Sequence, residues 1–251
     1  MDTKLEHFLQ TFVEKIKNHI THVVEFGSFK GEHDLTMSDV DLLVIVRDQI
    51  PFQQIVHEAH RLEENLLHIH HSAIAERLQQ LIFASQEYNG IHLLMVRRNE
   101  LDEHWQPCSF RLKLIMNTFI SKSIFLYAIK HHHRILYGED SSKDIVVPKP
   151  GIQDRLAIRW FPFVLLMLTL FNIRHRTDFV VWCCKSVRYR ESMEKIYCIL
   201  TGKPYQSLAT IKFHQYRYNP TAYTGSRLSL WLSALLIILA CPMVPDKRIV
   251  R

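Results

Sequence analysis

The stretch "VVEFGSFKGEHDLTMSDVDLLVIV", Val23 to Val46, holds two apolar runs separated by a polar segment. The first run ends at Gly27-Ser28, and the second opens with Asp-Val-Asp, residues 39–41, before Leu-Leu-Val-Ile-Val. Carboxylates are costly inside a strand that is otherwise aliphatic, because burial disfavours their charged form. The pattern therefore predicts two strands that contribute to one functional site.

Asp39 and Asp41 are expected on one face of the second strand, residues 39–46, because strand side chains alternate between faces. Val40 and Leu42 then point the other way, into the core. Two carboxylates this close repel each other unless a cation lies between them. Their hard oxygen atoms suit Mg²⁺ or Mn²⁺, so we predict a metal site at both aspartates. The alternative, an edge strand with its aspartates in water, fits the aliphatic run poorly.

Gly27 and Ser28 follow the preceding predicted strand, residues 22–26. Glycine lets the backbone approach a ligand closely, and successive N–H groups at such a turn can bind a phosphate. The serine hydroxyl can donate a further hydrogen bond to a phosphate oxygen. Next to a pair of metal-binding carboxylates, this turn predicts a site for the phosphates of a nucleotide.

"FGS", ten intervening residues and "DVDLLVIV" resemble the nucleotidyltransferase core of the DNA polymerase β superfamily. The likeness is to the small prokaryotic type, which includes aminoglycoside-modifying enzymes and antitoxins that adenylylate a partner toxin. It covers residues 20–47 and extends loosely to about residue 140, where "RILYGED" is similar to a segment that often follows this core.

This resemblance implies a nucleoside triphosphate (NTP) substrate and two Mg²⁺ ions, with an acceptor group attacking the α-phosphate and pyrophosphate leaving. On the family pattern, Gly27 and Ser28 hold the triphosphate, while Asp39 and Asp41 bind the metal ions. Two metal ions can stabilise both the attacking and the leaving oxygen of an in-line displacement.

The family normally supplies a third acidic residue from the next strand, where this chain has "NGIHLLMV". His92 or its neighbour stands at the expected position. Glu87 is an alternative source of the acid and Glu100 a less favoured one, whereas His92 can serve as a general base for the acceptor proton. A partly buried strand histidine without a catalytic role fits equally well. Two hypotheses follow: an active nucleotidyltransferase, or a catalytically weak or inactive nucleotide- or RNA-binding regulator on the same scaffold.

Charge is unevenly distributed along the 251 residues, whose formal net charge is +6. Residues 1–100 hold nine Lys/Arg and fifteen Asp/Glu, a net −6, and the remainder holds 22 and 10, a net +12. Basic surface suits a phosphate-bearing substrate or partner. Lys185 and Arg188, expected near one helical face, are predicted to reach the triphosphate or such an acceptor; a solvated basic face is the simpler alternative. The acceptor stays open: a small molecule, a protein side chain or an RNA.

Two segments of the basic half raise further alternatives. "KFHQYRYNPTAY", residues 212–223, interleaves aromatic and basic residues, which suits stacking on RNA bases, and core tyrosines beside a loop explain it nearly as well. Residues 228–244 are seventeen uncharged residues that include Pro242, so a buried core helix is expected rather than a membrane-associated tail. Five cysteines without a C-x-x-C pair, and a charged N-terminal segment, favour free thiols and a cytoplasmic protein.

Apolar spacing predicts an α+β fold with two domains. Residues 1–105 are expected to form a nucleotidyltransferase-like mixed sheet with flanking helices, from a helix at 3–19, strands at 22–26, 39–46 and 91–96, and a helix from 51 to about 81. Residues 106–251 are expected to be helical, with helices at 109–137, through 155–203 and at 226–241, and a connector at 131–151.

Overall fold

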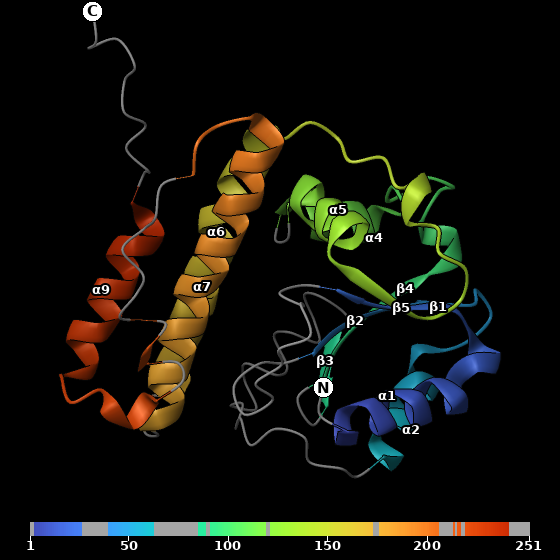
Figure 1. Cartoon of the computed structure of the whole chain (residues 1–251), viewed down its shortest axis with the longest axis horizontal. Coiled ribbons are helices and arrows are strands. Elements are labelled where there is room, and N and C mark those ends of the chain that lie inside the picture. Colours follow the sequence, from blue (N-terminus) through green and yellow to red (C-terminus); the bar gives the residue numbers. More distant parts are fainter. Residues whose placement is uncertain are drawn as a thin grey trace, which may run out of the picture. The chain divides into compact units, whose positions relative to one another are not determined.

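The computed structural model describes residues 3–26, 40–62, 85–88, 91–118, 121–172, 176–205, 213, 215–216 and 219–240. Its contacts divide the chain into two compact units, Met1–Ala157 and Ile158–Arg251. The helices and strands are α1 (Thr3–Ile16), β1 (Ile20–Phe26), β2 (Val40–Val46), α2 (Phe52–Arg61), β3 (Ser85–Tyr88), β4 (Ile91–Arg97), α4 (Phe110–Thr118), α5 (Lys122–His131), β5 (His133–Tyr137), α6 (Ile152–Leu168), α7 (Arg176–Thr201) and α9 (Arg227–Leu239) (Figure 1). Short 3₁₀ turns are η1 (Lys17–His19), η2 (Arg98–Glu100), η3 (Ser142–Asp144), η4 (Thr169–Asn172) and η5 (Pro220–Ala222).

The first unit is built around a five-stranded mixed sheet in the order β3-β4-β2-β1-β5. β1 pairs antiparallel with β2 and with β5, β2 pairs parallel with β4, and β4 pairs antiparallel with β3. β2 is the central strand, and its residues from Leu42 to Val46 are at most 2% exposed. A continuous aliphatic run is typical of a strand covered on both faces. The predicted α+β class is confirmed.

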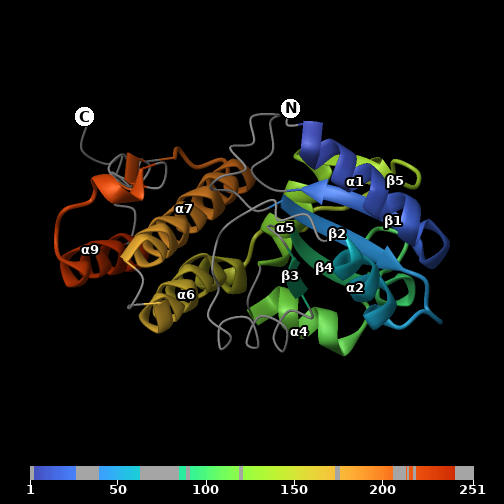
Figure 2. The ribbon, with the colours of Figure 1, turned by 90° about the horizontal axis from the view of Figure 1, so that it is seen from below.

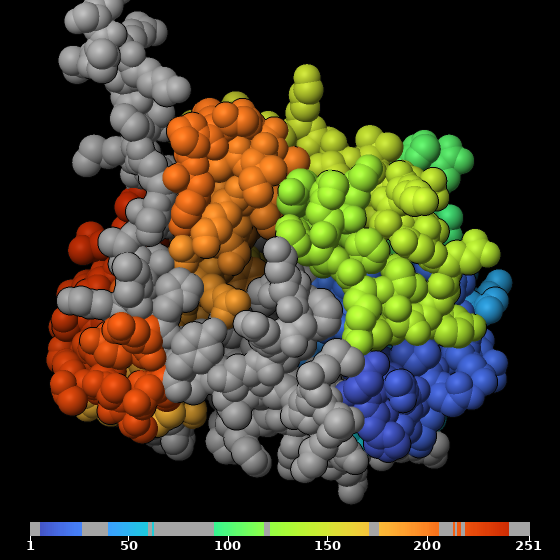
Figure 3. Space-filling view, in the orientation of Figure 1, coloured from blue at the N-terminus to red at the C-terminus, as the bar shows by residue number. Residues whose placement is uncertain are grey.

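Helices cover both faces of this sheet (Figures 1 and 2). α1 and α2 pack on one face, where they share a core with alternate residues of β2, namely Val40, Leu42, Val44 and Val46. The predicted inward direction of Val40 and Leu42 is therefore confirmed. α4 and α5 contribute to a second core with the other residues of β2, Leu43 and Ile45. Figure 3 shows α5 and the residues that follow it at the surface of the protein, on the face of the sheet that α4 and α5 cover.

Two strands were not expected from the sequence. β5 lies inside the segment predicted to be helical, residues 109–137, so that helix is wrong beyond His131. Five residues with the sequence HRILY are too few for periodicity to separate strand from helix, and pairing with β1 decides the outcome. Because β5 belongs to the same sheet as β1, the first compact unit extends past residue 105, where we placed the predicted domain boundary. β3 adds the opposite edge of the sheet.

The helix predicted from residue 51 to about 81 is described only as α2, which ends at Arg61. Residues 63–84 lie outside the described part of the chain. The N-terminal helix and the strand at 91–96 are found where they were predicted, within a few residues at each end.

The second unit is helical, as predicted. α7 is the longest described helix, and α9 packs against it around an apolar core that includes Leu166, Phe179, Cys183, Val187, Leu230, Ala234 and Ile238. Cys183, Cys184 and Cys198 are buried free thiols here, whereas Cys108 of the first unit is exposed. Burial raises the pKa of Cys183 and raises that of Cys184 to about 12.

Among the described residues, no single helix is both long and apolar enough to cross a membrane, although the bent pair Phe110–Asn117 and Lys122–His131 passes by length and composition alone.

Candidate active site at one end of the central strands

Asp41 lies near the start of β2, at the end of the sheet where β2 and the parallel strand β4 both begin. It is partly exposed, whereas the residues that follow it in β2 are buried. Since β2 has a neighbouring strand on each side, the edge-strand alternative does not hold for Asp41. The structure thus places one predicted metal-binding carboxylate near the start of a central strand.

One rung of the sheet contains Asp41. Its backbone pairs with Phe26 of β1 and with His92 of β4, and His92 in turn pairs with Glu87 of β3. Neighbouring strands are about 4.8 Å apart, so the three candidate residues occupy consecutive positions along this rung. His92 is the residue that the register sets beside Asp41. The side chains of Glu87 and His92 are not among those described, and their catalytic roles stay predictions.

α5 supports this end of β1 through an aromatic contact. The rings of Phe26 and Phe125 meet edge to face, with centroids 5.4 Å apart and an interplanar angle of 84°. Phe26 is the last residue of β1 and directly precedes Gly27 in the chain. The contact therefore fixes the point from which the predicted phosphate-binding turn departs.

Gly27, Ser28 and Asp39 lie outside the described residues, so their predicted binding of triphosphate and metal stays a prediction. Within the described part of the chain, no three His, Cys, Asp or Glu side chains are grouped closely enough to hold a metal ion. Asp41 contributes the kind of ligand atom that Mg²⁺ prefers, a carboxylate oxygen. A metal site here would need Asp39 as its second protein ligand.

A buried ion pair on the α1 side of the sheet, which includes the residue before Phe26 in β1, was missed by the sequence analysis. Glu25 is 1% exposed and accepts a hydrogen bond of 2.8 Å from Arg134 Nε, while Arg134 Nη1 donates to Glu6 at 2.9 Å. Burial lowers the pKa of Arg134, but the two carboxylates outweigh this effect and leave it raised. The triad joins α1, β1 and β5. The available signal was a glutamate inside "HVVEF", the same type of anomaly that singled out the aspartates.

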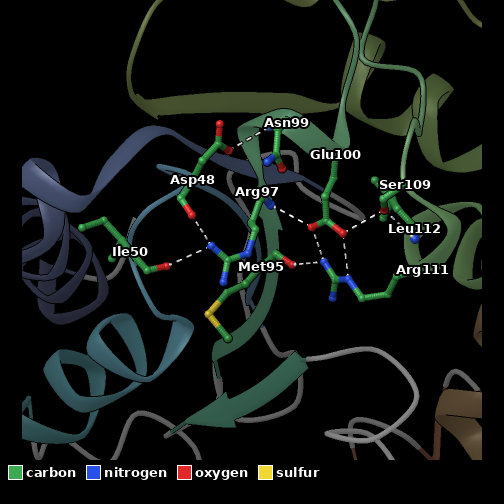
Figure 4. Close-up of polar contacts among 9 residues, drawn as sticks. All are labelled: Asp48, Ile50, Met95, Arg97, Asn99, Glu100, Ser109, Arg111 and Leu112. Atoms are coloured by element: carbon green, nitrogen blue, oxygen red, sulfur yellow. Dashed lines mark hydrogen bonds and ion pairs between the residues drawn. The ribbon is translucent and has the colours of Figure 1, made fainter.

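Glu100 belongs to a different network, at the opposite end of β4 (Figure 4). Its carboxylate accepts hydrogen bonds from Ser109 Oγ at 2.8 Å, Arg111 Nε at 2.9 Å and the Arg97 backbone N–H at 3.0 Å. Burial alone would raise the pKa of Glu100, but these donors lower it overall. A carboxylate satisfied in this way has a structural role.

The same network ties β4 to the segment that follows β2. The Arg97 guanidinium donates to the carbonyl oxygens of Asp48 and Ile50, and the Asn99 N–H donates to Asp48 Oδ1 at 2.9 Å (Figure 4). His92 and Arg97 are five residues apart on an extended strand, about 16 Å. Glu100 is therefore too far along the strand to act as the third acid beside Asp41.

Lys185 and Arg188 lie on α7 in the second unit, and both are partly buried. Lys185 Nζ is 5.1 Å from the ring centroid of Trp182, a cation–π contact within the same helix. Their binding of phosphates stays a prediction.

The segment at 212–223 contributes two tyrosines to the core of the second unit. Tyr216 and Tyr223 pack against that core and meet each other edge to face, with centroids 5.0 Å apart. Arg176 Nη2 donates to the carbonyl oxygens of Tyr223 and Gly225, at 2.8 and 3.0 Å. These two tyrosines therefore follow the core alternative rather than the one that invoked stacking on RNA.

No protein-family model matches the chain, and no curated protein matches it significantly. Among solved structures, that of spectinomycin adenyltransferase AAD(9) from Enterococcus faecialis with ATP and spectinomycin is similar over 98% of this chain and 93% of that one, with a TM-score of 0.44 and 16% identity.

Proposed function

We propose that this chain is a Mg²⁺-dependent nucleotidyltransferase that moves a nucleoside monophosphate from an NTP to an acceptor. One observation carries the proposal: Asp41, the second carboxylate of Asp-Val-Asp, lies partly exposed near the start of the central strand. The Gly-Ser turn follows directly after Phe26, the residue paired with Asp41. This pairing supports the proposal, because Gly27 and Ser28 directly follow in sequence the residue that pairs with Asp41.

In this proposal, Gly27 and Ser28 bind the triphosphate through backbone N–H groups and a hydroxyl. Asp39 and Asp41 hold two Mg²⁺ ions, or Mn²⁺, which supply stabilisation of the negative charge that develops on the reacting oxygens. Phe125 keeps the end of β1 in place through its contact with Phe26.

His92 accepts the proton of the attacking acceptor group, because the register sets it beside Asp41. Glu87, one strand further along the rung, is the alternative base. Lys185 and Arg188 of the basic half bind phosphates of the substrate. The acceptor is a small hydroxylated molecule, a protein side chain or an RNA, and the reaction takes place in the cytoplasm.

The test is nucleotide transfer by the full chain with each labelled NTP, Mg²⁺ and cell extract as the source of acceptor. We expect a labelled product with the wild type and none with Asp39→Asn/Asp41→Asn. Glu103→Gln is the matched control, because its side chain is 85% exposed and also loses one carboxylate. Equal labelling by the wild type and the double variant, or no labelling under any condition, would exclude the enzyme.

A non-catalytic nucleotide- or RNA-binding regulator is the second candidate. It is favoured by the residue that pairs with Asp41 on β4, which is histidine where the family pattern implies an acid. Calorimetry with a non-hydrolysable ATP analogue and Mn²⁺ separates the two functions. Binding that needs Asp41, without transfer from any hydrolysable NTP, supports the regulator; an RNA-binding version would also show a steep dependence on salt.

A further inference from the structure

The outer side of α9 is a row of exposed leucines. Leu228, Leu232, Leu236 and Leu239 recur at helical spacing and are 67, 44, 71 and 52% exposed. At 100° per residue they fall within a sector of about 80° on the helix surface. Single exposed leucines are common, but four on one side of a 13-residue helix form a continuous apolar strip. We call these four residues the leucine strip.

The opposite side of α9 is anchored in the protein. Leu230, Ala234 and Ile238 are at most 3% exposed in the core shared with α7. Arg190 of α7, which is fully buried, donates from Nε to the Ile238 carbonyl oxygen at 3.3 Å and from Nη2 to that of Ala240 at 3.4 Å. A cation at the C-terminal carbonyl groups stabilises the end of a helix. The leucine strip is therefore presented by a fixed helix.

The sequence on either side of α9 is mainly basic. Residues 206–245 contain no Asp or Glu, and their charged residues are Lys212, Arg217 and Arg227. Three of the four charged residues after α9 are also basic, namely Lys247, Arg248 and Arg251. An apolar strip flanked in sequence by basic residues complements a surface that is apolar below and anionic above. A bilayer with anionic headgroups has this layering.

A second copy of the chain fits the strip less well. A face one helix wide and 13 residues long projects to roughly 200 Å², against about 800 Å² per partner in a stable interface. An RNA partner would account for the basic residues but not for the exposed leucines.

We propose that α9 binds peripherally to an anionic lipid bilayer, with the leucine strip entering the boundary between headgroups and acyl chains. Thirteen residues are too few for the roughly 20 that cross a bilayer, so the helix lies along the surface. The basic residues that flank α9 in the sequence contribute attraction to the headgroups. The inference is independent of the nucleotidyltransferase reaction.

The experiment is flotation of the full chain with two kinds of vesicle: phosphatidylcholine alone, and phosphatidylcholine with 30 mol% phosphatidylserine. We expect the wild type to float with the anionic vesicles, at least 5-fold less with the neutral ones, and less again in 1 M salt. Leu232→Gln/Leu236→Gln should reduce flotation at least 5-fold, and the single variant Leu236→Gln should have an intermediate effect.

Ser229→Gln/Ser233→Gln is the matched control, because both serines are exposed on α9 outside the strip; it should float like the wild type. Thermal unfolding of every variant should match the wild type, since the substituted side chains are exposed. Three results would overturn the proposal: no flotation of the wild type, equal flotation of the strip variant, or a wild-type dimer in sedimentation that the strip variant abolishes without any vesicle binding.

Discussion

Asp41 and His92 lie opposite each other on the parallel strands β2 and β4, where the family pattern implies two carboxylates. The position on β4 is therefore the most informative place to separate an enzyme with an unusual base from a binding protein.

Replacement of His92 tests its role as the base. His92→Ala should lower kcat by about 10² to 10⁴, the usual contribution of a general base. The wild-type rate should fall in acid, because a base that is already protonated cannot accept the proton of the acceptor. His92→Asp should move that acid limb to lower pH, since an aspartate has an ordinary pKa near 3.9. The pH profile of kcat is the measurement.

His104→Ala is the matched control, because its imidazole is about half exposed and follows the opposite end of β4 from His92. If His92→Ala has a wild-type rate and profile while Glu87→Gln is inactive, the base is Glu87.

Gly138 is predicted to tolerate no side chain. Its φ is +93°, and a Cβ there would lie 2.5 Å from the Thr21 carbonyl oxygen and 2.7 Å from His22 Cδ2. Gly138→Ala should therefore lower the free energy of unfolding by more than the roughly 1–2 kcal/mol of the left-handed conformation alone. Gly202→Ala is the control, with φ of +67° and no atom within 4 Å. Urea unfolding of both variants should show the larger loss at Gly138, and equal losses would contradict the close approach.

The stability that Glu100 contributes is predicted to depend on pH. Because its pKa in the folded protein is lowered from 4.5, its contribution to stability is complete above about pH 4.5 and is lost as pH falls through the lowered value. Glu100→Gln should cost about 1–3 kcal/mol at pH 7, since the donors Arg111 and Ser109 lose a charged acceptor. In urea unfolding, the difference in free energy of unfolding between Glu100→Gln and the wild type should become smaller below pH 4.5. If this difference stayed constant down to pH 3, Glu100 would not be ionised in the folded protein. The control Glu103→Gln should have the free energy of unfolding of the wild type at every pH.

The triad of Glu6, Arg134 and Glu25 predicts a strong non-additive effect. Arg134→Met should destabilise the first unit by about 3–5 kcal/mol, because it removes the guanidinium from a carboxylate that is 1% exposed. Glu25→Gln/Arg134→Met should recover part of this loss, since no buried charge then needs a partner. Chemical unfolding of the two single variants and the double variant gives the coupling. Additive effects would mean that the ion pair contributes little.

Local sequence was sufficient for some of these features. A run such as "DLLVIV" is aliphatic at every position, so it predicted both a strand and its central place in the sheet. Periodicity also located α1. The ranges expected to be helical, 155–203 and 226–241, contain most of α6 and all of α7 and α9, but the boundary between α6 and α7 was not predicted. The short strand β5 could not be found in this way, because five residues that follow a helix carry no distinguishable period.

The candidate site shows the same division. The chemistry at Asp39 and Asp41 is indicated by carboxylates within an aliphatic run, a signal confined to a few residues. The pairing of Asp41 with His92 joins residues 51 positions apart, and it depends on how β2 and β4 align in the folded sheet. The pairing of Glu25 with Arg134 spans 109 positions. Such contacts depend on the packing of the whole unit, so no local sequence pattern predicts them.

The described thiols of the two units differ in accessibility, and this difference provides a chemical probe of unfolding. Cys108 is exposed and should react at once with an alkylating reagent. Cys183 and Cys184 are buried, and burial raises the pKa of both thiols. Alkylation of this vicinal pair must wait for the helices of the second unit to part. Timed labelling read by mass spectrometry would thus measure how often that unit opens, with Cys108 as the internal standard for unhindered reaction.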